Sequence, residues 1–163
     1  MDLLNKEIIK LASLKKLSID KFGKEAINIF NFRKKAYYDQ YIYSLLRTKN
    51  KKLIFELYYQ IEANETSINQ LSKKYSSGSE KSKYGIIGPV NLQQVNSEIA
   101  NILKFSSDSI INEPIEINNE WFLIQKETCI IAIYNNFYRN KICMELLEKD
   151  LEKEYFNLIK PKT

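Results

Sequence analysis

The sequence contains no histidine among its 163 residues. The common zinc sites use histidine, and imidazole is the usual acid–base group near neutral pH, so both kinds of site are excluded. The chain also has no glycine-rich phosphate loop, no metal-ligand spacing and no nucleophile–base pair. We therefore expect no metal, no cofactor and no conventional hydrolytic or group-transfer centre.

Cysteine is scarce, with only Cys129 and Cys143. If the segment between them is mostly one helix, a rise of about 1.5 Å per residue places them roughly 20 Å apart. A disulfide needs Cα atoms only about 4.4–6.8 Å apart, so this pair is not expected to form one. Both are predicted to be buried structural thiols.

Long apolar runs are missing as well. The longest aliphatic-type run after Lys126 is CIIAI, whereas a membrane-spanning helix needs about 20 residues. The opening MDLLNKEIIK lacks the basic start, the uninterrupted apolar core and the small-residue cleavage site of a secretory signal. On these grounds we expect a soluble, cytoplasmic protein.

Positive charge is concentrated near the amino terminus. The net charge is +5, and residues 1–52 hold 13 of the 25 basic side chains but only 5 of the 20 acidic ones. The segments FRKKAYY and RTKNKK mix aromatic and basic residues, which can stack on bases and neutralise phosphates. Nucleic-acid binding therefore stays an alternative, although lysines on helix faces are usually only solvated.

The amino-terminal third has the periodicity of helices. Apolar residues at three- and four-residue steps predict an amphipathic helix over 3–17. Ser18 is a candidate N-cap for a second helix over 19–38. Gly23 is the weak point of that second helix, since glycine costs about 1 kcal/mol in a helix interior.

From Tyr41 onward the pattern mixes strands and helices. QYIYSLLR predicts a strand, residues 53–63 a helix, and the segment after Thr66 or Ser67 a second helix. SSGSEKSK, residues 76–83, is expected to be a loop. The remaining expected elements are an extended segment at YGIIGPV, a helix over 91–105, a hairpin with strands 114–117 and 120–126, and a helix over 130–158.

Glycine and proline are rare, yet KYGIIGPVNL holds two of the four glycines and one of the three prolines. With the preceding residues it forms INQLSKKYSSGSEKSKYGIIGPV, which resembles a stretch of the parvulin family of peptidyl-prolyl cis-trans isomerases. The matching positions are Ile68, Leu71, Tyr75, Ser76, Gly85, Ile87 and Gly88. EPIEINNEWFLIQKE is similar to the closing hairpin of that family, and the element order over 41–127 agrees with it.

The resemblance implies an α+β fold in three parts. A parvulin-like domain over 41–127 would have a small antiparallel sheet of about four strands wrapped by helices. Residues 1–40 would form a basic helical region, and residues 128–163 a long C-terminal helix packing with it. Foldase-chaperones that contain a parvulin domain share this arrangement.

The implied function is binding of unfolded or proline-containing polypeptide and isomerisation of X–Pro bonds. The polar centre departs from the family pattern, because Ser44 and Phe122 match the usual pair of histidines, and Ser77 and Gly78 match an Asp or Cys. We therefore predict weak or lost isomerase activity, with Ser44, Ser77 and Phe122 as the positions of the catalytic centre.

Apolar residues near these positions are candidates for a substrate cleft, and each has a plain core role as its alternative. They are Leu46, Val90, Val95, Ile99 and Trp121. The loop from Ser77 to Lys83 would border this cleft, and Lys81 and Lys83 would favour acidic or carbonyl-rich clients. A non-catalytic escort protein with one fixed partner is the remaining alternative.

Overall fold

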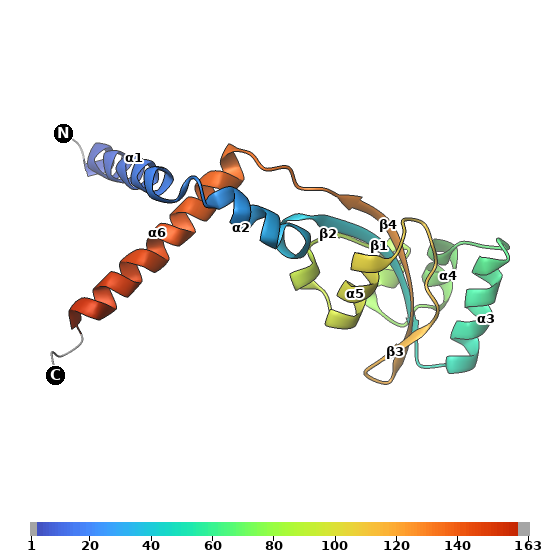
Figure 1. Cartoon of the computed structure of the whole chain (residues 1–163). Coiled ribbons are helices and arrows are strands. Elements are labelled where there is room, and N and C mark those ends of the chain that lie inside the picture. The colour runs from blue at the N-terminus through green and yellow to red at the C-terminus, as the bar shows by residue number, and fades with distance from the viewer. Residues whose placement is uncertain (1–2, 160–163) are drawn as a thin grey trace. The chain divides into compact units, whose positions relative to one another are not determined.

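The computed structural model describes residues 3–159 (Figure 1). Within this part, the chain divides into two compact units. One unit comprises residues 34–132, and the other comprises the residues up to Arg33 together with those from Ile133 onward. Each unit is described separately.

The unit of residues 34–132 is built on a four-stranded antiparallel sheet with the strand order β2-β1-β4-β3. The strands are β1 (Gln40–Thr48), β2 (Ile86–Val90), β3 (Ile115–Ile117) and β4 (Glu120–Ile130). β1 and β4 lie at the centre and pair along their length, from Gln40 with Ile130 to Thr48 with Trp121. The expected α+β class and four-stranded sheet are confirmed, including the hairpin turn at Asn118 and Asn119.

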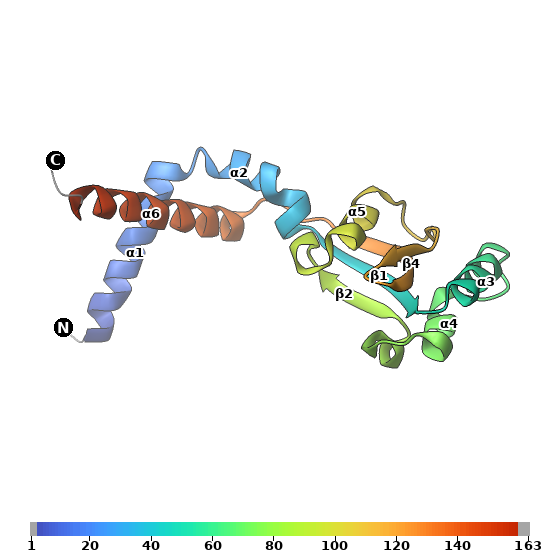
Figure 2. The ribbon, with the colours of Figure 1, turned by 90° about the horizontal axis from the view of Figure 1, so that it is seen from below.

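Helices cover both faces of this sheet (Figures 1 and 2). On one face, α3 (Lys51–Glu62) and α4 (Ile68–Tyr75) pack against Leu46 and Leu123. On the other face, α5 (Ser97–Phe105) and the short 3-10 helix η3 (Leu92–Gln94) pack against a second apolar cluster. The buried members of that cluster are Tyr41, Tyr43, Leu45, Leu92, Ile99, Leu103, Ile117, Phe122 and Ile124.

Side-chain caps fix the starts of these helices. The Asn50 Oδ1 accepts from the Leu53 N–H at 3.1 Å, and the Ser67 Oγ accepts from the Gln70 N–H at 3.3 Å. Ser67, one of the two predicted caps, is therefore the cap of α4. The single helix expected over 91–105 is instead two pieces, η3 and α5, and Asn96 caps the second piece.

The expectation of a plain loop over residues 76–83 is wrong. Residues Ser79–Lys83 form the 3-10 helix η2, which ends at Tyr84 in the left-handed region. The Glu80 carbonyl holds this turn by accepting from the Gly85 N–H at 2.9 Å. The polar composition concealed the turn, because its only buried side chain is the charged Glu80.

The second unit consists of α1 (Leu3–Phe22), α2 (Ala26–Arg33) and α6 (Asn136–Ile159). α1 and α2 both pack against α6, and the Phe30 ring of α2 contacts the rings of Tyr134 and Tyr138, with centroid distances of 5.3 and 5.0 Å. The Ser18 cap is wrong, because Ser18 is buried inside α1 and donates to the Lys15 carbonyl at 2.8 Å. The chain instead turns at Gly23.

The long C-terminal helix begins later than expected. Residues up to Ile130 extend β4, and Asn135 caps α6 by accepting from the Phe137 N–H at 3.0 Å. The premise of one helix joining the cysteines is therefore wrong, since Cys129 lies in β4 and Cys143 in α6. Both are free thiols whose pKa is raised by burial; Cys143 is buried and Cys129 half-buried.

None of the helices in residues 3–159 is long and apolar enough to cross a membrane.

Candidate functional site

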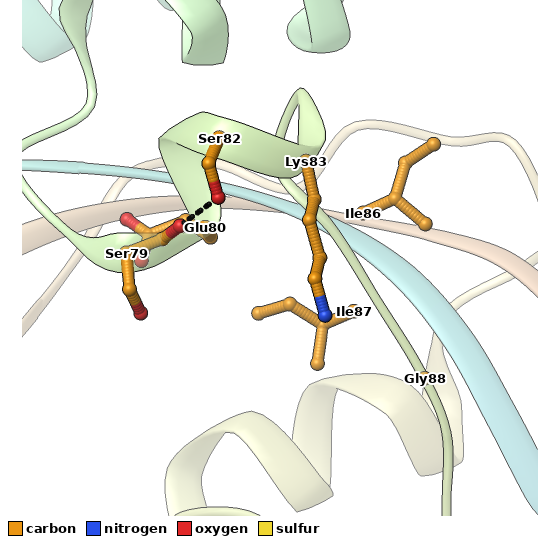
Figure 3. A pocket seen from close by; sticks show the side chains of 7 residues that line it. All are labelled: Ser79, Glu80, Ser82, Lys83, Ile86, Ile87 and Gly88. Atoms are coloured by element: carbon orange, nitrogen blue, oxygen red, sulfur yellow. Dashed lines mark hydrogen bonds between the residues drawn. The ribbon is translucent and has the colours of Figure 1, made fainter.

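A pocket of about 660 Å³ opens between η2 and β2 (Figure 3). Its lining residues are Ser79, Glu80, Ser82, Lys83, Ile86, Ile87 and Gly88. The β2 side is apolar, with Ile86 exposed and Ile87 half-buried against the core. The η2 side is polar, and Lys83 extends from η2 toward the part of β2 where Ile87 lies. The pocket thus places an apolar surface beside a cation.

Two glycines allow β2 to lie close to β1. The Gly85 carbonyl accepts from the Leu45 N–H at 2.9 Å, and Gly85 has φ +81°. Gly88 has φ +119°, and a Cβ there would collide with the Tyr41 carbonyl oxygen. Side chains at these positions would be strained, so glycine is required where the chain enters and follows the pocket wall. The Gly88–Pro89 peptide bond is cis.

Glu80 is a buried carboxylate at the pocket wall, with 7% of its surface exposed. Its Oε1 accepts from the Arg47 Nε at 3.2 Å and also from the Ser76 hydroxyl. The Ser76 Oγ in turn accepts from the Arg47 N–H at 3.2 Å. These bonds tie η2 to the central strand β1 and compensate the buried charge.

The Arg47–Glu80 pair fills the space beside Gly78. A Cβ at Gly78 would collide with the Arg47 guanidinium and with the Glu80 carboxylate. The resemblance matches Ser77 and Gly78 to an Asp or Cys, and here a side chain at position 78 would require the Arg47 and Glu80 side chains to move. The Glu80 carboxylate instead supplies the negative charge in this region, two residues further along the chain.

Tyr43 carries a second polar group close to this carboxylate. Its side chain belongs to the core cluster on the α5 face, with 4% of its surface exposed. Burial, and then the nearby Glu80 charge, raise the pKa of Tyr43 to about 12. The phenol is therefore neutral throughout the physiological range.

Ser44 and Phe122 lie on opposite faces of the sheet. The Ser44 hydroxyl donates to the Glu127 Oε1 at 2.5 Å and accepts from the Asn69 Nδ2 of α4 at 2.7 Å. Phe122 is buried in the cluster under α5. The two positions therefore do not form one polar centre, and neither lines the pocket. On the face of Phe122, the buried polar groups include the Tyr41 and Tyr43 phenols.

Ser77, the third catalytic candidate, lies beside the pocket without lining it. It is exposed, and its N–H and Oγ both donate to the Arg47 carbonyl, at 2.9 and 3.2 Å. Its observed contacts thus hold the start of the η2 segment on β1. A direct role of Ser77 in chemistry stays a prediction.

The five apolar candidates divide between the two sheet faces. Val90 and Val95 pack against the cluster under α5, which contains Ile99. Leu46 is fully buried on the α3 and α4 face. Trp121 is half-buried on that same face, with its ring 5.6 Å from Phe55 and beneath the Lys51 ammonium at 4.8 Å. The structure therefore does not gather these five residues into one cleft.

Sequence reasoning missed three polar residues of this region, Tyr43, Arg47 and Glu80. Arg47 and Glu80 are 33 positions apart, so no local spacing connects them. The one available signal was a single acidic residue among the serines and lysines of SSGSEKSK. Within the described residues, no group of three or more Cys, Asp or Glu side chains could hold a metal ion.

The unit of residues 34–132 is thus an α+β domain with a four-stranded antiparallel sheet, helices on both faces, and a pocket beside strand β2. Residues 44–128 match the model of the rotamase family, described as the PPIC-type PPIase domain. The match spans more than half of the chain, so the chain belongs to this parvulin-type family, as the resemblance indicated.

Solved structures share the fold. PrsA from Bacillus anthracis matches at 16% identity with a TM-score of 0.58, over 85% of this chain and 61% of that one. The foldase PrsA from Streptococcus pneumoniae matches at 16% identity with a TM-score of 0.59, over 96% of this chain and 61% of that one. A solved structure described with the SurA-like chaperones PEB4 and Cj1289 of Campylobacter jejuni matches at 15% identity with a TM-score of 0.51. The match covers 94% of this chain and 68% of that one.

The chain thus spans about three fifths of the length of the two PrsA proteins. No curated protein sequence matches it.

Proposed function

We propose that this chain binds proline-containing polypeptide in the pocket between η2 and β2 and accelerates isomerisation of the X–Pro bond. The observation that carries the proposal is the pocket itself, in which Ile87 lies beside the polar turn of Glu80 and Lys83 and Ile86 also contributes to the lining. Membership of the PPIC-type family supports the reaction class. Foldase and chaperone are the descriptions of the related proteins, and a foldase role for this chain is part of the proposal.

The reaction needs no covalent intermediate. Rotation about the peptide bond has a barrier of about 20 kcal/mol, because conjugation between the carbonyl and the nitrogen is lost at the top. An enzyme accelerates it by binding the twisted amide more tightly than either planar form. The chemistry therefore requires an apolar seat for the proline ring and a polar group that meets the twisted amide.

The pocket residues fit these two tasks. Ile87, which lies next to Lys83, offers the apolar seat. In the twisted amide the prolyl nitrogen regains its lone pair and accepts hydrogen bonds, and the Lys83 ammonium is a donor at the pocket edge. Glu80 contacts Arg47 and Ser76, so its task is to hold η2 in place rather than to meet the substrate. The positive charge of Lys83 at the edge of the pocket favours a substrate with an acidic residue before the proline.

The Lys83→Ala variant tests this assignment. With a short Glu-Pro peptide, we expect the wild-type chain to reach a kcat/KM on the order of 10⁴ M⁻¹ s⁻¹, at the low end of the enzyme range. Loss of the Lys83 donor should lower this value about tenfold, as one hydrogen bond to a charged group is worth at least that much. The cis–trans exchange rate, measured by NMR exchange spectroscopy, gives both numbers.

Lys81→Ala is the matched control. Lys81 lies in the same turn, is exposed, and bonds the Lys74 carbonyl at 3.1 Å without lining the pocket. Its loss should leave the rate unchanged. Equal effects of the two variants would contradict the role of Lys83, and a wild-type chain without any rate enhancement would contradict the isomerase proposal.

A further inference from the structure

Tyr84 has a backbone conformation that usually belongs to glycine. It follows η2 with φ 56° and ψ 30°, in the left-handed region, and its N–H donates to the Lys81 carbonyl at 3.2 Å. Glycine is the common residue at such a helix end, because a Cβ is crowded there. A residue with a side chain keeps this conformation where its surroundings hold it, and such positions gather at functional sites. The side chain and the carbonyl of Tyr84 are both held from α4.

The Lys73 ammonium of α4 holds the Tyr84 side chain. Its Nζ donates to the Tyr84 hydroxyl at 2.8 Å and lies 4.5 Å from the centre of the ring. This hydrogen bond, and then the positive charge of Lys73, lower the pKa of Tyr84. Tyr84 is 47% exposed, so packing in the core does not explain why a tyrosine stands here.

The Asn69 amide of the same helix holds the Tyr84 main chain. Its Nδ2 donates to the Tyr84 carbonyl at 3.1 Å and to the Ser44 hydroxyl of β1 at 2.7 Å. Because Ser44 is fully buried, the second bond fixes the amide against the sheet. Asn69 and Lys73 are four residues apart in α4, so they lie on one face of the helix. This face therefore fixes both the main chain and the side chain of Tyr84.

The conformation of Tyr84 sets the direction of its neighbour Lys83. Lys83 is the last residue of η2 and lines the pocket, and β2 begins at Ile86. A different φ or ψ at Tyr84 would rotate η2 relative to β2 and would carry Lys83 with it. In the structure Lys83 extends toward the part of β2 where Ile87 lies (Figure 3).

We propose that Tyr84, held by Lys73 and Asn69, is a positioning residue that directs the Lys83 ammonium into the pocket. We call these three residues the Tyr84 clamp. All three lie outside the pocket lining, so the clamp acts through Lys83 rather than on the substrate. The catalytic part of this inference rests on the proposed function, whereas the position of Lys83 does not. A donor that meets only the twisted amide has to be in place when the bond rotates, so its aim affects kcat more than binding.

Lys73→Met and Tyr84→Asn test the clamp. The first removes the donor and keeps a long unbranched side chain, and the second keeps a residue that tolerates the left-handed region. With the Glu-Pro peptide, each variant should lower kcat about fivefold and change KM less than about twofold. Because the clamp acts through Lys83, adding K73M to K83A should cause no further loss. NMR exchange spectroscopy at several peptide concentrations separates kcat from KM.

Lys74→Met is the matched control. Lys74 is the next residue of α4, and its ammonium lies 4.9 Å from the centre of the Tyr75 ring instead of contacting Tyr84. This variant should leave kcat unchanged. Equal losses in K73M and K74M, or additive losses in K73M/K83A, would overturn the proposal.

Nuclear Overhauser contacts between the Lys83 side chain and the Ile87 methyl groups report the position of Lys83 without any turnover. We expect these contacts in the wild type and in K74M, and we expect them to weaken in K73M and Y84N. Their absence from the wild type, or full contacts in both clamp variants, would overturn the proposal. If the expected pattern occurs in a chain without any rate enhancement, the isomerase proposal fails and the positioning of Lys83 by the clamp stands.

Discussion

Replacement of Glu80 by Gln should destabilise the unit of residues 34–132 by about 2 kcal/mol. The substitution keeps the side-chain volume but removes the negative charge that the Arg47 guanidinium and the Ser76 hydroxyl contact. Hydrogen bonds to charged groups contribute about 1.5–3 kcal/mol each. Arg47 is one-third exposed and has a second carboxylate partner, which limits the loss to the lower part of that range.

Glu120→Gln is the control for this prediction. Glu120 contacts the same arginine, with its Oε2 3.6 Å from the Arg47 Nη1, but it is more exposed than Glu80. Exposed ion pairs contribute about 0–1 kcal/mol, so this variant should be nearly neutral in urea unfolding. Because Glu80 anchors η2, E80Q should also accelerate amide exchange at residues 79–83. Equal stability of the two variants would contradict the anchoring role of Glu80.

Tyr43 alone should lower the stability of the same unit by about 2 kcal/mol between pH 10 and pH 12. Burial and the Glu80 charge raise the pKa of Tyr43 to about 12 in the fold, whereas an unfolded tyrosine titrates near pH 10. Below pH 10 both states hold the proton, and the stability is fully present. Between the two pKa values only the unfolded chain loses its proton at Tyr43, so the free energy of the unfolded state falls relative to that of the folded state as the pH rises.

Tyr43→Phe isolates this contribution, since the ring stays and only the hydroxyl is lost. Burial also raises the pKa of Tyr41, so sources of alkaline sensitivity other than Tyr43 remain in both proteins. Those sources are common to both proteins and cancel in the difference. The wild-type curve from urea unfolding should therefore be steeper than that of Y43F between pH 10 and 12. Parallel curves would show that the Tyr43 phenol is not held neutral by the fold.

Most of the strand and helix order was readable from the sequence. The strand at QYIYSLLR, the cap at Ser67 and the hairpin turn at Asn118 and Asn119 have local signals that the structure confirms. The predictions are wrong where one residue type is compatible with two different local structures. Ser18 has the chemistry of an N-cap, yet its hydroxyl bonds a carbonyl inside α1 instead.

The polar centre could not be placed, because β1 is covered by helices on both faces. Its residues from Tyr43 to Leu46 are all buried, so no alternation shows which side chains share a face. An error of one residue in aligning a strand with the family pattern moves a position to the other face of the sheet. Such a shift accounts for Ser44 and Phe122, which were matched to one polar centre but lie on opposite faces. The Arg47–Glu80 pair depends on a contact between distant segments, which only the fold creates.

The central claim is that a proline peptide binds between η2 and β2, and amide chemical shifts of the isotope-labelled full chain test it most directly. On titration with a short Glu-Pro peptide, we predict that the shifted signals belong to residues 79–83 and 86–88, with smaller changes at the neighbouring Arg47. The signals of Trp121, and those of Ser44 on the α4 face, should stay in place. Shifts gathered around Trp121 or on α6, with none at residues 86–88, would contradict the account.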